Sequence, residues 1–182
     1  MNLILLPSEG FRSREAASFF SQMEDQAQRL LESVKDITPQ ELEWQPARGM
    51  NTIGMLLAHV ALGEGVWTQR ALLGLTEIDL KPAIGLALED NGIPLAADDE
   101  PPAGLKGKTL ADYEAYLARA RAYFRDAAVA LTEADLDREI TITRRSGGPN
   151  VMNFRWVLYH VLEHFAGHLG QILLLRHLYR AR

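Results

Sequence analysis

Apolar residues recur at spacings of three and four positions along four long stretches of the chain, which is the spacing of an amphipathic helix. The four predicted helices cover residues 16–34, 52–73, 109–131 and 153–179. Polar residues that can cap a helix stand at the starts of the last three, namely Asn51 or Thr52, Thr109 and Asn153. The pattern therefore predicts a helical chain whose elements pack through their apolar faces.

The segments between these helices carry shorter signals. Residues 38–41, Thr-Pro-Gln-Glu, form a helix-start pattern and predict a helical turn over residues 39–44. Residues 74–108 contain five glycines and four prolines, which predict a long connection. Such a crossover lets the helix after it run parallel to the helix before it. Polar and apolar residues alternate over residues 139–143, which predicts a short strand or an extended linker.

Composition and charge limit the class of protein. A length of 182 residues fits one domain, so we expect a single domain over residues 1–182. The net charge of −5 and the scattered basic residues argue against a nucleic-acid partner. The apolar opening of the chain is too short to span a membrane and lacks the basic residues of a signal peptide, so we expect no membrane partner and a cytoplasmic location. The chain has no cysteine, which excludes disulfides, thiolate ligands and a thiol nucleophile of its own.

Three of the five histidines, His160, His164 and His168, lie one helical turn apart in the last predicted helix. Neighbours in this series lie about 6 Å apart along the helix axis, so either adjacent pair can bind one metal ion. The outer two are separated by about 12 Å, which is too far for both to bind an ion at about 2.1 Å. His164 belongs to both possible pairs. Phe165 stands where the His-Glu-x-x-His motif of zinc peptidases has its general base, so this series does not predict peptide hydrolysis.

A fourth histidine, His59, lies on the apolar side of the second predicted helix. Taken alone, it is explained by a core histidine that forms a hydrogen bond. Helical bundles, however, build metal sites from side chains that facing helices present to the core. Three imidazoles with open coordination positions suit a divalent transition metal that acts as a Lewis acid.

Two stretches carry a resemblance to a known family. TPQELEWQPARGMNTIGMLLAHVA and the later HVLEHFAGHLGQI resemble the DinB-like superfamily, including its thiol-dependent transferase branch, and the resemblance extends from the first predicted helix to the last. It implies an all-α fold, an up-down-down-up four-helix bundle with the long crossover between helices two and three, and a homodimer. It also implies a divalent metal ion, nickel or zinc, held by His59, His164 and His168. Leu169 stands where many members have Arg, which alters the expected recognition of an anionic substrate.

The remaining polar residues near this centre receive lesser roles. His160 becomes a spare histidine, in the core or beside the ligands. Gln171, three positions after His168, is expected to hydrogen-bond a bound cofactor or a neighbouring histidine, or else to form an ordinary bond between helices. Glu64 is placed to approach the centre from helix two. No residue is predicted to be catalytic in its own right.

The activity that the resemblance implies is that of a transferase or isomerase, in which a low-molecular-weight thiol activated by the metal attacks a small-molecule substrate. The lack of cysteine agrees with this activity, because the sulfur then has to come from a cosubstrate. Two alternatives stay open. One is a non-catalytic bundle that binds a metal or a small ligand in a stress response, and the other is a metal-dependent hydrolase that uses a bound water.

Overall fold

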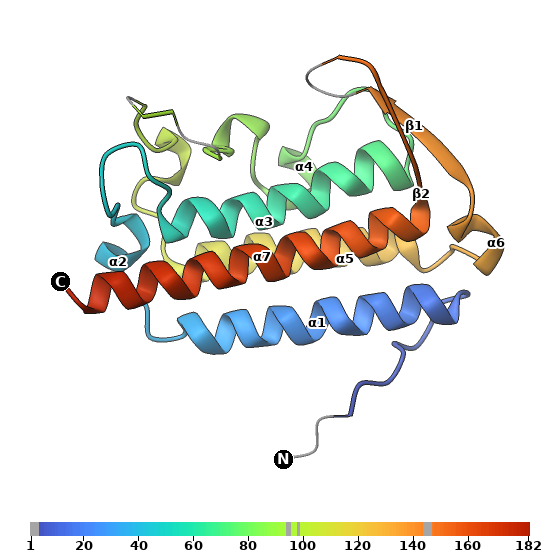
Figure 1. Ribbon diagram of the computed structural model, residues 1–182, viewed down its shortest axis with the longest axis horizontal. Coiled ribbons are helices and arrows are strands. Elements are labelled where there is room, and N and C mark those ends of the chain that lie inside the picture. The colour runs from blue at the N-terminus through green and yellow to red at the C-terminus, as the bar shows by residue number, and fades with distance from the viewer. Residues whose placement is uncertain (1–3, 94–95, 98, 144–146) are drawn as a thin grey trace.

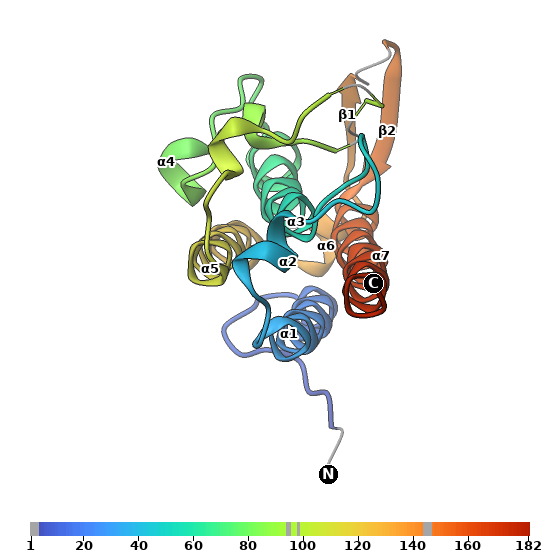
Figure 2. The same ribbon diagram turned by 90° about the vertical axis from the view of Figure 1, so that its left-hand side faces the viewer.

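Four long helices form the body of the protein in the computed structural model, which describes residues 4–93, 96–97, 99–143 and 147–182. They are α1 (Arg14–Val34), α3 (Ile53–Trp67), α5 (Leu110–Ala128) and α7 (Phe154–Arg180). The four lie along the long axis of the molecule, α1 and α7 running in one direction and α3 and α5 in the other (Figure 1). The end-on view places α3 opposite α1 and α5 opposite α7 (Figure 2). Each helix therefore has two neighbours and turns one face to a shared core.

Each long helix begins at a polar side chain that accepts a hydrogen bond from the helix backbone. These capping residues are Ser13, Thr52, Thr109 and Asn153. The Thr52 hydroxyl accepts from the backbone N–H of Met55 at 3.0 Å, so Thr52 rather than Asn51 caps α3. The predicted starts of the last three long helices are thus confirmed, and Ser13 adds the cap that the pattern did not supply for α1.

Shorter elements connect the long helices. They are α2 (Pro39–Glu43), α4 (Lys81–Ile84), α6 (Glu133–Leu136), a π-helical turn at Thr68–Leu72 and 3₁₀ turns at Leu88–Asp90 and Ala103–Leu105. The π-helical turn continues α3 directly, within the stretch predicted as one helix. The long connection crosses over α3, and its helix α4 packs on α3 and α5 (Figure 2).

A β-hairpin interrupts the helical pattern. It pairs β1 (Glu139–Thr143) with β2 (Pro149–Asn153) in antiparallel register, Glu139 opposite Asn153. The chain is mostly helical, as predicted, and this two-stranded hairpin is the only sheet among the described residues. The alternating pattern over β1 left open a strand or a linker, and the structure forms the strand. The sequence Pro-Asn-Val-Met-Asn of β2 shows no strong strand signal, because its conformation depends on pairing with β1.

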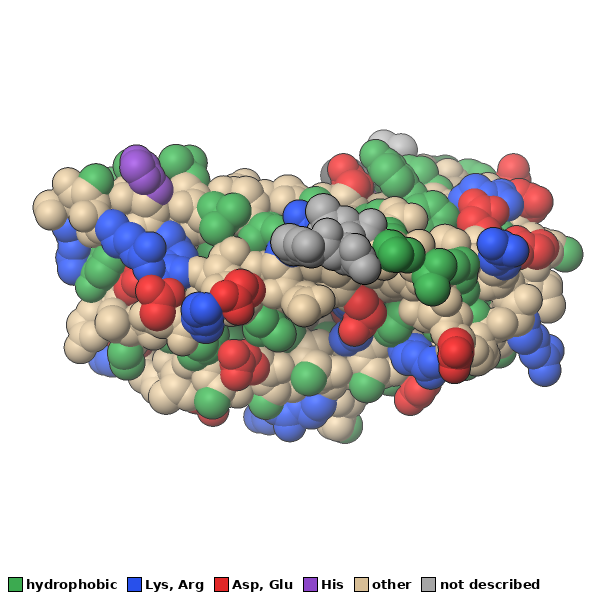
Figure 3. Space-filling view, turned by 90° about the horizontal axis from the view of Figure 1, so that it is seen from below, with side chains coloured by type: hydrophobic (Ala, Val, Ile, Leu, Met, Phe, Trp, Pro, Cys, Tyr) green, Lys and Arg blue, Asp and Glu red, His purple; other side chains and the backbone are tan. Residues whose placement is uncertain are grey.

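The core has two large parts, which meet near the middle of α7, and a small third cluster of Ala71, Met152 and Val157. One part lies mainly between α3, α5 and α7 and includes Phe165, whereas the other lies toward the start of α7 and includes Val161. His164, between these two residues, therefore sits where tightly packed regions join. On the face seen from below, acidic and basic side chains are interspersed (Figure 3). Among the described residues, no helix has both the length and the apolar character that a membrane span requires.

Candidate metal centre

Three histidine side chains converge between α3 and α7. His59 comes from the middle of α3, and His164 and His168 lie one turn apart on α7. The Nε2 atom of His164 lies 2.9 Å from that of His59 and 3.1 Å from that of His168. Nitrogens that share a metal ion at about 2.0–2.1 Å stand about 2.8–3.4 Å apart, depending on the coordination geometry. The structure thus brings together the three predicted histidines at a spacing suited to one metal ion.

Close packing between α3 and α7 makes this approach possible. Residues on both sides of His59 in α3 are fully buried, so the backbone that carries this histidine is fixed. Gly63 lies one turn further along α3, directly against the ring of His164. A Cβ atom at this position would stand 3.0 Å from Cε1 of His164, which is closer than ordinary van der Waals contact. A glycine at position 63 therefore leaves room for the imidazole of α7 to reach the centre.

Hydrogen bonds on the outer nitrogens aim two of the imidazoles inward. Nδ1 of His59 lies 2.9 Å from Oδ1 of Asn91, and that same oxygen accepts the backbone N–H of Ile93 at 3.3 Å. Because a carboxamide oxygen only accepts, His59 carries its hydrogen on Nδ1. Nδ1 of His168 donates in the same way to Oε1 of Gln171 at 2.8 Å. Both histidines therefore direct an Nε2 lone pair at the centre, the arrangement that outer-shell partners impose on metal ligands.

Burial keeps His59 and His164 neutral at pH 7. Burial, followed by the neighbouring His168, His59 and His160, lowers the pKa of His164 to about 3. Burial also lowers the pKa of His59, against the opposing effect of its hydrogen bond to Asn91. Nε2 of His164 can donate a hydrogen to only one of the two lone pairs that face it, whereas a cation satisfies all three nitrogens at once. The donor set therefore fits a divalent transition metal.

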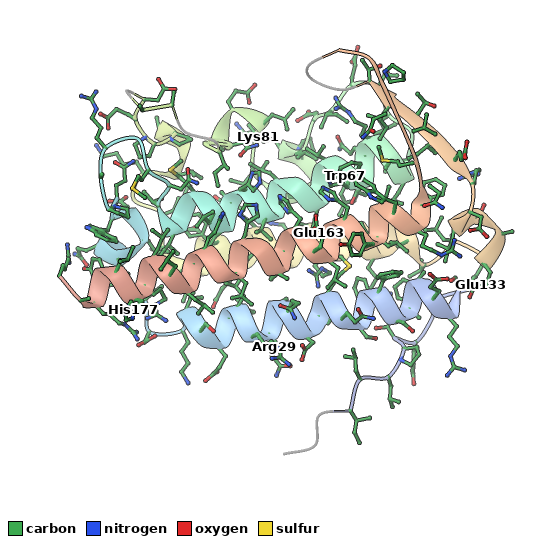
Figure 4. All side chains as sticks on the ribbon, in the orientation of Figure 1. Arg29, Trp67, Lys81, Glu133, Glu163 and His177 are labelled. Carbon is green, nitrogen blue, oxygen red and sulfur yellow. The ribbon has the colours of Figure 1, made fainter. Side chains whose placement is uncertain are left out.

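The other two histidines stand outside this cluster. His160 stacks on Trp156 with 4.7 Å between ring centroids, meets Trp67 edge-on at 4.9 Å, and pairs with Glu163 at 3.1 Å. Trp67 and Glu163 are labelled in Figure 4, which also shows His177 near the C-terminal end of α7, far from the centre. His160 is thus the spare histidine beside the cluster, 5.7 Å from the His164 ring between centroids.

Glu64 does not reach the histidines, contrary to the expectation from its position in the sequence. Its buried carboxylate accepts two hydrogen bonds from Arg121 of α5, one of them 3.0 Å long. Arg121 in turn binds Glu24 of α1 at 2.8 Å. Burial of a carboxylate requires such a partner, so Glu64 serves the packing of three helices rather than the metal centre.

Two residues of the centre were missed from sequence. Asn91 lies in the long connection, 32 positions from the histidine that it orients, and no local pattern links the two. Gly63 stands in a predicted helix, where a glycine is unfavourable unless a close approach requires it. Gly63 was the one feature of the sequence that indicated a close contact on this helix, but it did not indicate that His164 is the contacting residue.

The sequence is similar to a known protein family. A family model described as the DinB superfamily matches residues 22–172, a range that begins within α1, ends within α7 and contains all three histidines. The chain belongs to the DinB superfamily. The resemblance seen in the sequence is therefore confirmed. No curated protein matches the sequence of this DinB-superfamily protein.

A cleft adjoins the centre of this DinB-superfamily protein. It has a volume of about 750 Å³ and lies between the end of α3 with its π-helical turn, the long connection, and β1. Asn91, which orients His59, forms part of its wall. A smaller hollow of about 160 Å³ shares Val66, Arg70 and Thr143 with the cleft and extends to Trp67 and the hairpin. Small-molecule sites in proteins have this size range, so the centre has space for a substrate beside it.

Proposed function

We propose that this DinB-superfamily protein is a divalent-metal-dependent transferase, which joins a low-molecular-weight thiol to an electrophilic small molecule. His59, His164 and His168 hold the metal ion, nickel or zinc, both of which accept imidazole ligands. The observation that carries the proposal is the convergence of three imidazoles, in which Nε2 of His164 lies 2.9 Å from that of His59 and 3.1 Å from that of His168.

The chemistry follows from this donor set and from what the chain lacks. A divalent metal ion held there lowers the pKa of a thiol and so supplies a thiolate nucleophile at neutral pH. The chain has no cysteine, so the thiol comes from a cosubstrate. Asn91 and Gln171 hold the rings of His59 and His168, and the half-buried position of the three histidines limits access of bulk water. An isomerase that works through a reversible thiol adduct would use the same residues.

Metal-dependent hydrolysis has less support. That reaction needs a general base beside the metal-bound water. Among the described residues, the carboxylates on nearby turns are engaged elsewhere, Glu64 with Arg121 and Glu163 with His160. Neither carboxylate belongs to the group of side chains that converge on the centre.

We also infer that the four long helices form the up-down-down-up bundle typical of this superfamily, and that two copies of the chain associate. The helix directions in Figure 1 support the bundle. Exposed leucines on α7, among them Leu174 with 58% of its surface accessible, support the association, because a contiguous exposed apolar surface marks an interaction site.

The experiment that tests the activity measures thioether formation. Protein loaded with nickel or zinc is mixed with a panel of low-molecular-weight thiols and an aryl halide whose thioether absorbs light, and the rate is compared with the uncatalysed rate. We expect acceleration with at least one thiol, its loss in His164→Ala, and its retention in His177→Ala, which changes a histidine remote from the centre. A protein that binds the metal tightly but accelerates no thiol would instead be a non-catalytic metal-binding bundle.

A further inference from the structure

The cleft beside the metal centre is lined by one positively charged side chain, that of Arg70. The guanidinium of Arg70 lines both the cleft and the smaller hollow. Within the described part of the chain, Arg70 forms no ion pair or hydrogen bond, whereas Arg121, Arg155 and Arg176 are each bound to two acidic residues. Arg14 also has no ion pair among the described residues, but Arg70 is the arginine that lines the cleft and can bind a ligand there.

The backbone that carries Arg70 is held rigidly. Arg70 belongs to the π-helical turn Thr68–Leu72, and such turns within helices are frequent at functional sites. The adjacent Gln69 is buried and forms two hydrogen bonds with the backbone of Asp79, donating to its carbonyl at 2.7 Å and accepting its N–H at 3.0 Å. These bonds tie the turn to the first part of the long connection. The guanidinium is therefore presented from a fixed base, which reduces the entropy lost when it binds a ligand.

The remaining walls of the cleft define the kind of ligand. Val66, Ile78 and Leu88 make much of the lining apolar. Glu89 also lines the cleft, and in the described residues it forms no ion pair with Arg70 or with any other base. A carboxylate at this position repels a second negative charge on a ligand, so a molecule with one anionic group is favoured over a dianion.

The cleft and the smaller hollow each share a residue that contacts a histidine. Asn91 belongs to its wall and binds Nδ1 of His59, while Trp67 of the smaller hollow packs on His160, next to His164. Along α3 and its π-helical turn, eleven positions separate His59 from Arg70, a rise of about 16 Å for regular helix. Since an extended arginine side chain covers part of this distance, a ligand of modest size can extend from Arg70 toward the centre.

We propose that this cleft binds a small molecule with an apolar body and a single carboxylate, and that Arg70 is the residue that anchors the carboxylate. Arginine suits this role because its planar guanidinium donates two parallel hydrogen bonds to a carboxylate. The carboxylate belongs either to the thiol or to the electrophile. Binding of a carboxylate in the cleft does not depend on the proposed transferase activity, whereas a role of this carboxylate in catalysis rests on the proposed function.

The first experiment uses metal-free protein, so that it does not depend on the metal centre. Phenylbutyrate and its neutral analogue phenylbutyramide are titrated into the protein, and binding is followed by residue-resolved amide NMR spectra. We expect saturable shifts at cleft residues with phenylbutyrate, and an affinity at least about tenfold lower in Arg70→Gln. The matched control is Arg14→Gln, which removes a guanidinium at the start of α1, outside the cleft, and should leave the affinity unchanged. Glu89→Gln should strengthen binding of the dianion phenylsuccinate more than binding of phenylbutyrate.

Three results would overturn the proposal: no saturable shifts at cleft residues, equal affinity for phenylbutyrate and phenylbutyramide, or the same affinity in Arg70→Gln as in Arg14→Gln. Because Arg70 is exposed and without a protein partner in the described structure, its replacement should not disturb folding, which circular dichroism verifies.

A second arm, on nickel-loaded protein, identifies the source of the carboxylate by comparing mercaptopropionate with mercaptoethanol. If Arg70→Gln removes a preference for mercaptopropionate, the thiol carries the carboxylate. If it leaves thiol binding unchanged but weakens phenylbutyrate, the electrophile carries it. Failure of nickel to bind would refute the proposed metal chemistry and leave the carboxylate result standing.

Discussion

Replacing Gly63 with alanine tests whether the fit between α3 and α7 controls the metal centre. The added Cβ atom would stand 3.0 Å from Cε1 and 3.4 Å from Nδ1 of His164. Carbon atoms in comfortable contact are about 3.5–4.0 Å apart, so the His164 ring has to retreat by a few tenths of an ångström. Metal–ligand distances tolerate deviations of only about 0.2 Å. The substitution therefore moves the central ligand beyond the range in which all three nitrogens can bind one ion well.

The same change has opposing effects on the stability of the fold. Alanine in place of glycine within a helix stabilises by about 0.5–1 kcal/mol, and overpacking costs about 1–3 kcal/mol. The net change in the free energy of unfolding of metal-free protein should thus stay within about 2.5 kcal/mol. Metal affinity, in contrast, should fall about 10- to 100-fold, the loss seen when the support of a metal ligand is disturbed.

Competition with a chromophoric chelator measures the metal affinity, and urea unfolding of the metal-free protein measures stability. Gly167→Ala is the matched control, because Gly167 is a helical glycine of α7 where, outside its own stretch of helix, no atom of the described residues lies within 4 Å of the added methyl group. It should stabilise the fold slightly and leave the affinity unaltered. Wild-type affinity in Gly63→Ala would refute the view that close packing at His164 sets the geometry of the centre.

Three further predictions follow from the contacts of the site and of the core. Asn91→Ala and Gln171→Ala each free a ligand ring and should weaken zinc binding about 10- to 100-fold in the same chelator competition, with little change in unfolding. The pKa of His164 is about 3 in the folded protein against an ordinary value of 6.5, so the unfolded chain binds more protons between these two pH values. Metal-free protein should therefore lose stability as the pH falls from 6.5 toward 3. Urea titrations over this pH range should show a smaller loss in His164→Gln than in wild type. Arg121→Ala leaves the 3%-exposed side chain of Glu64 without its main partner and should cost about 3–5 kcal/mol in urea unfolding, whereas replacing both residues by apolar ones of similar size should restore most of the loss.

The long helices could be predicted from sequence because each is signalled locally. Spacing of apolar residues and capping by Thr52, Thr109 and Asn153 act within a few positions of one another, and the structure repeats them. Of the hairpin, only β1 was signalled in the sequence. β2 becomes a strand because it pairs with β1 rather than because of its own composition. Predictions of this kind succeed where local and tertiary forces agree.

In the candidate site, too, locally signalled features could be predicted and features that depend on distant contacts could not. The turn-by-turn spacing of His164 and His168 is local, and His59 entered the prediction through the family resemblance, so all three were named. Asn91 was not, because a contact across 32 positions depends on how the long connection folds. The predicted approach of Glu64 to the centre was wrong for a related reason. Its position on α3 does not reveal that Arg121 of α5 binds its carboxylate.

The most direct test of the metal centre is elemental analysis of gently purified protein, with wild type beside His59→Ala, His164→Ala and His160→Ala. The three converging Nε2 atoms predict about one divalent ion per chain in wild type, lost in the first two variants and kept in His160→Ala, whose ring lies beside the cluster but outside it. Wild-type protein that stays metal-free even after exposure to nickel, zinc and manganese would contradict the account and make these histidines core residues.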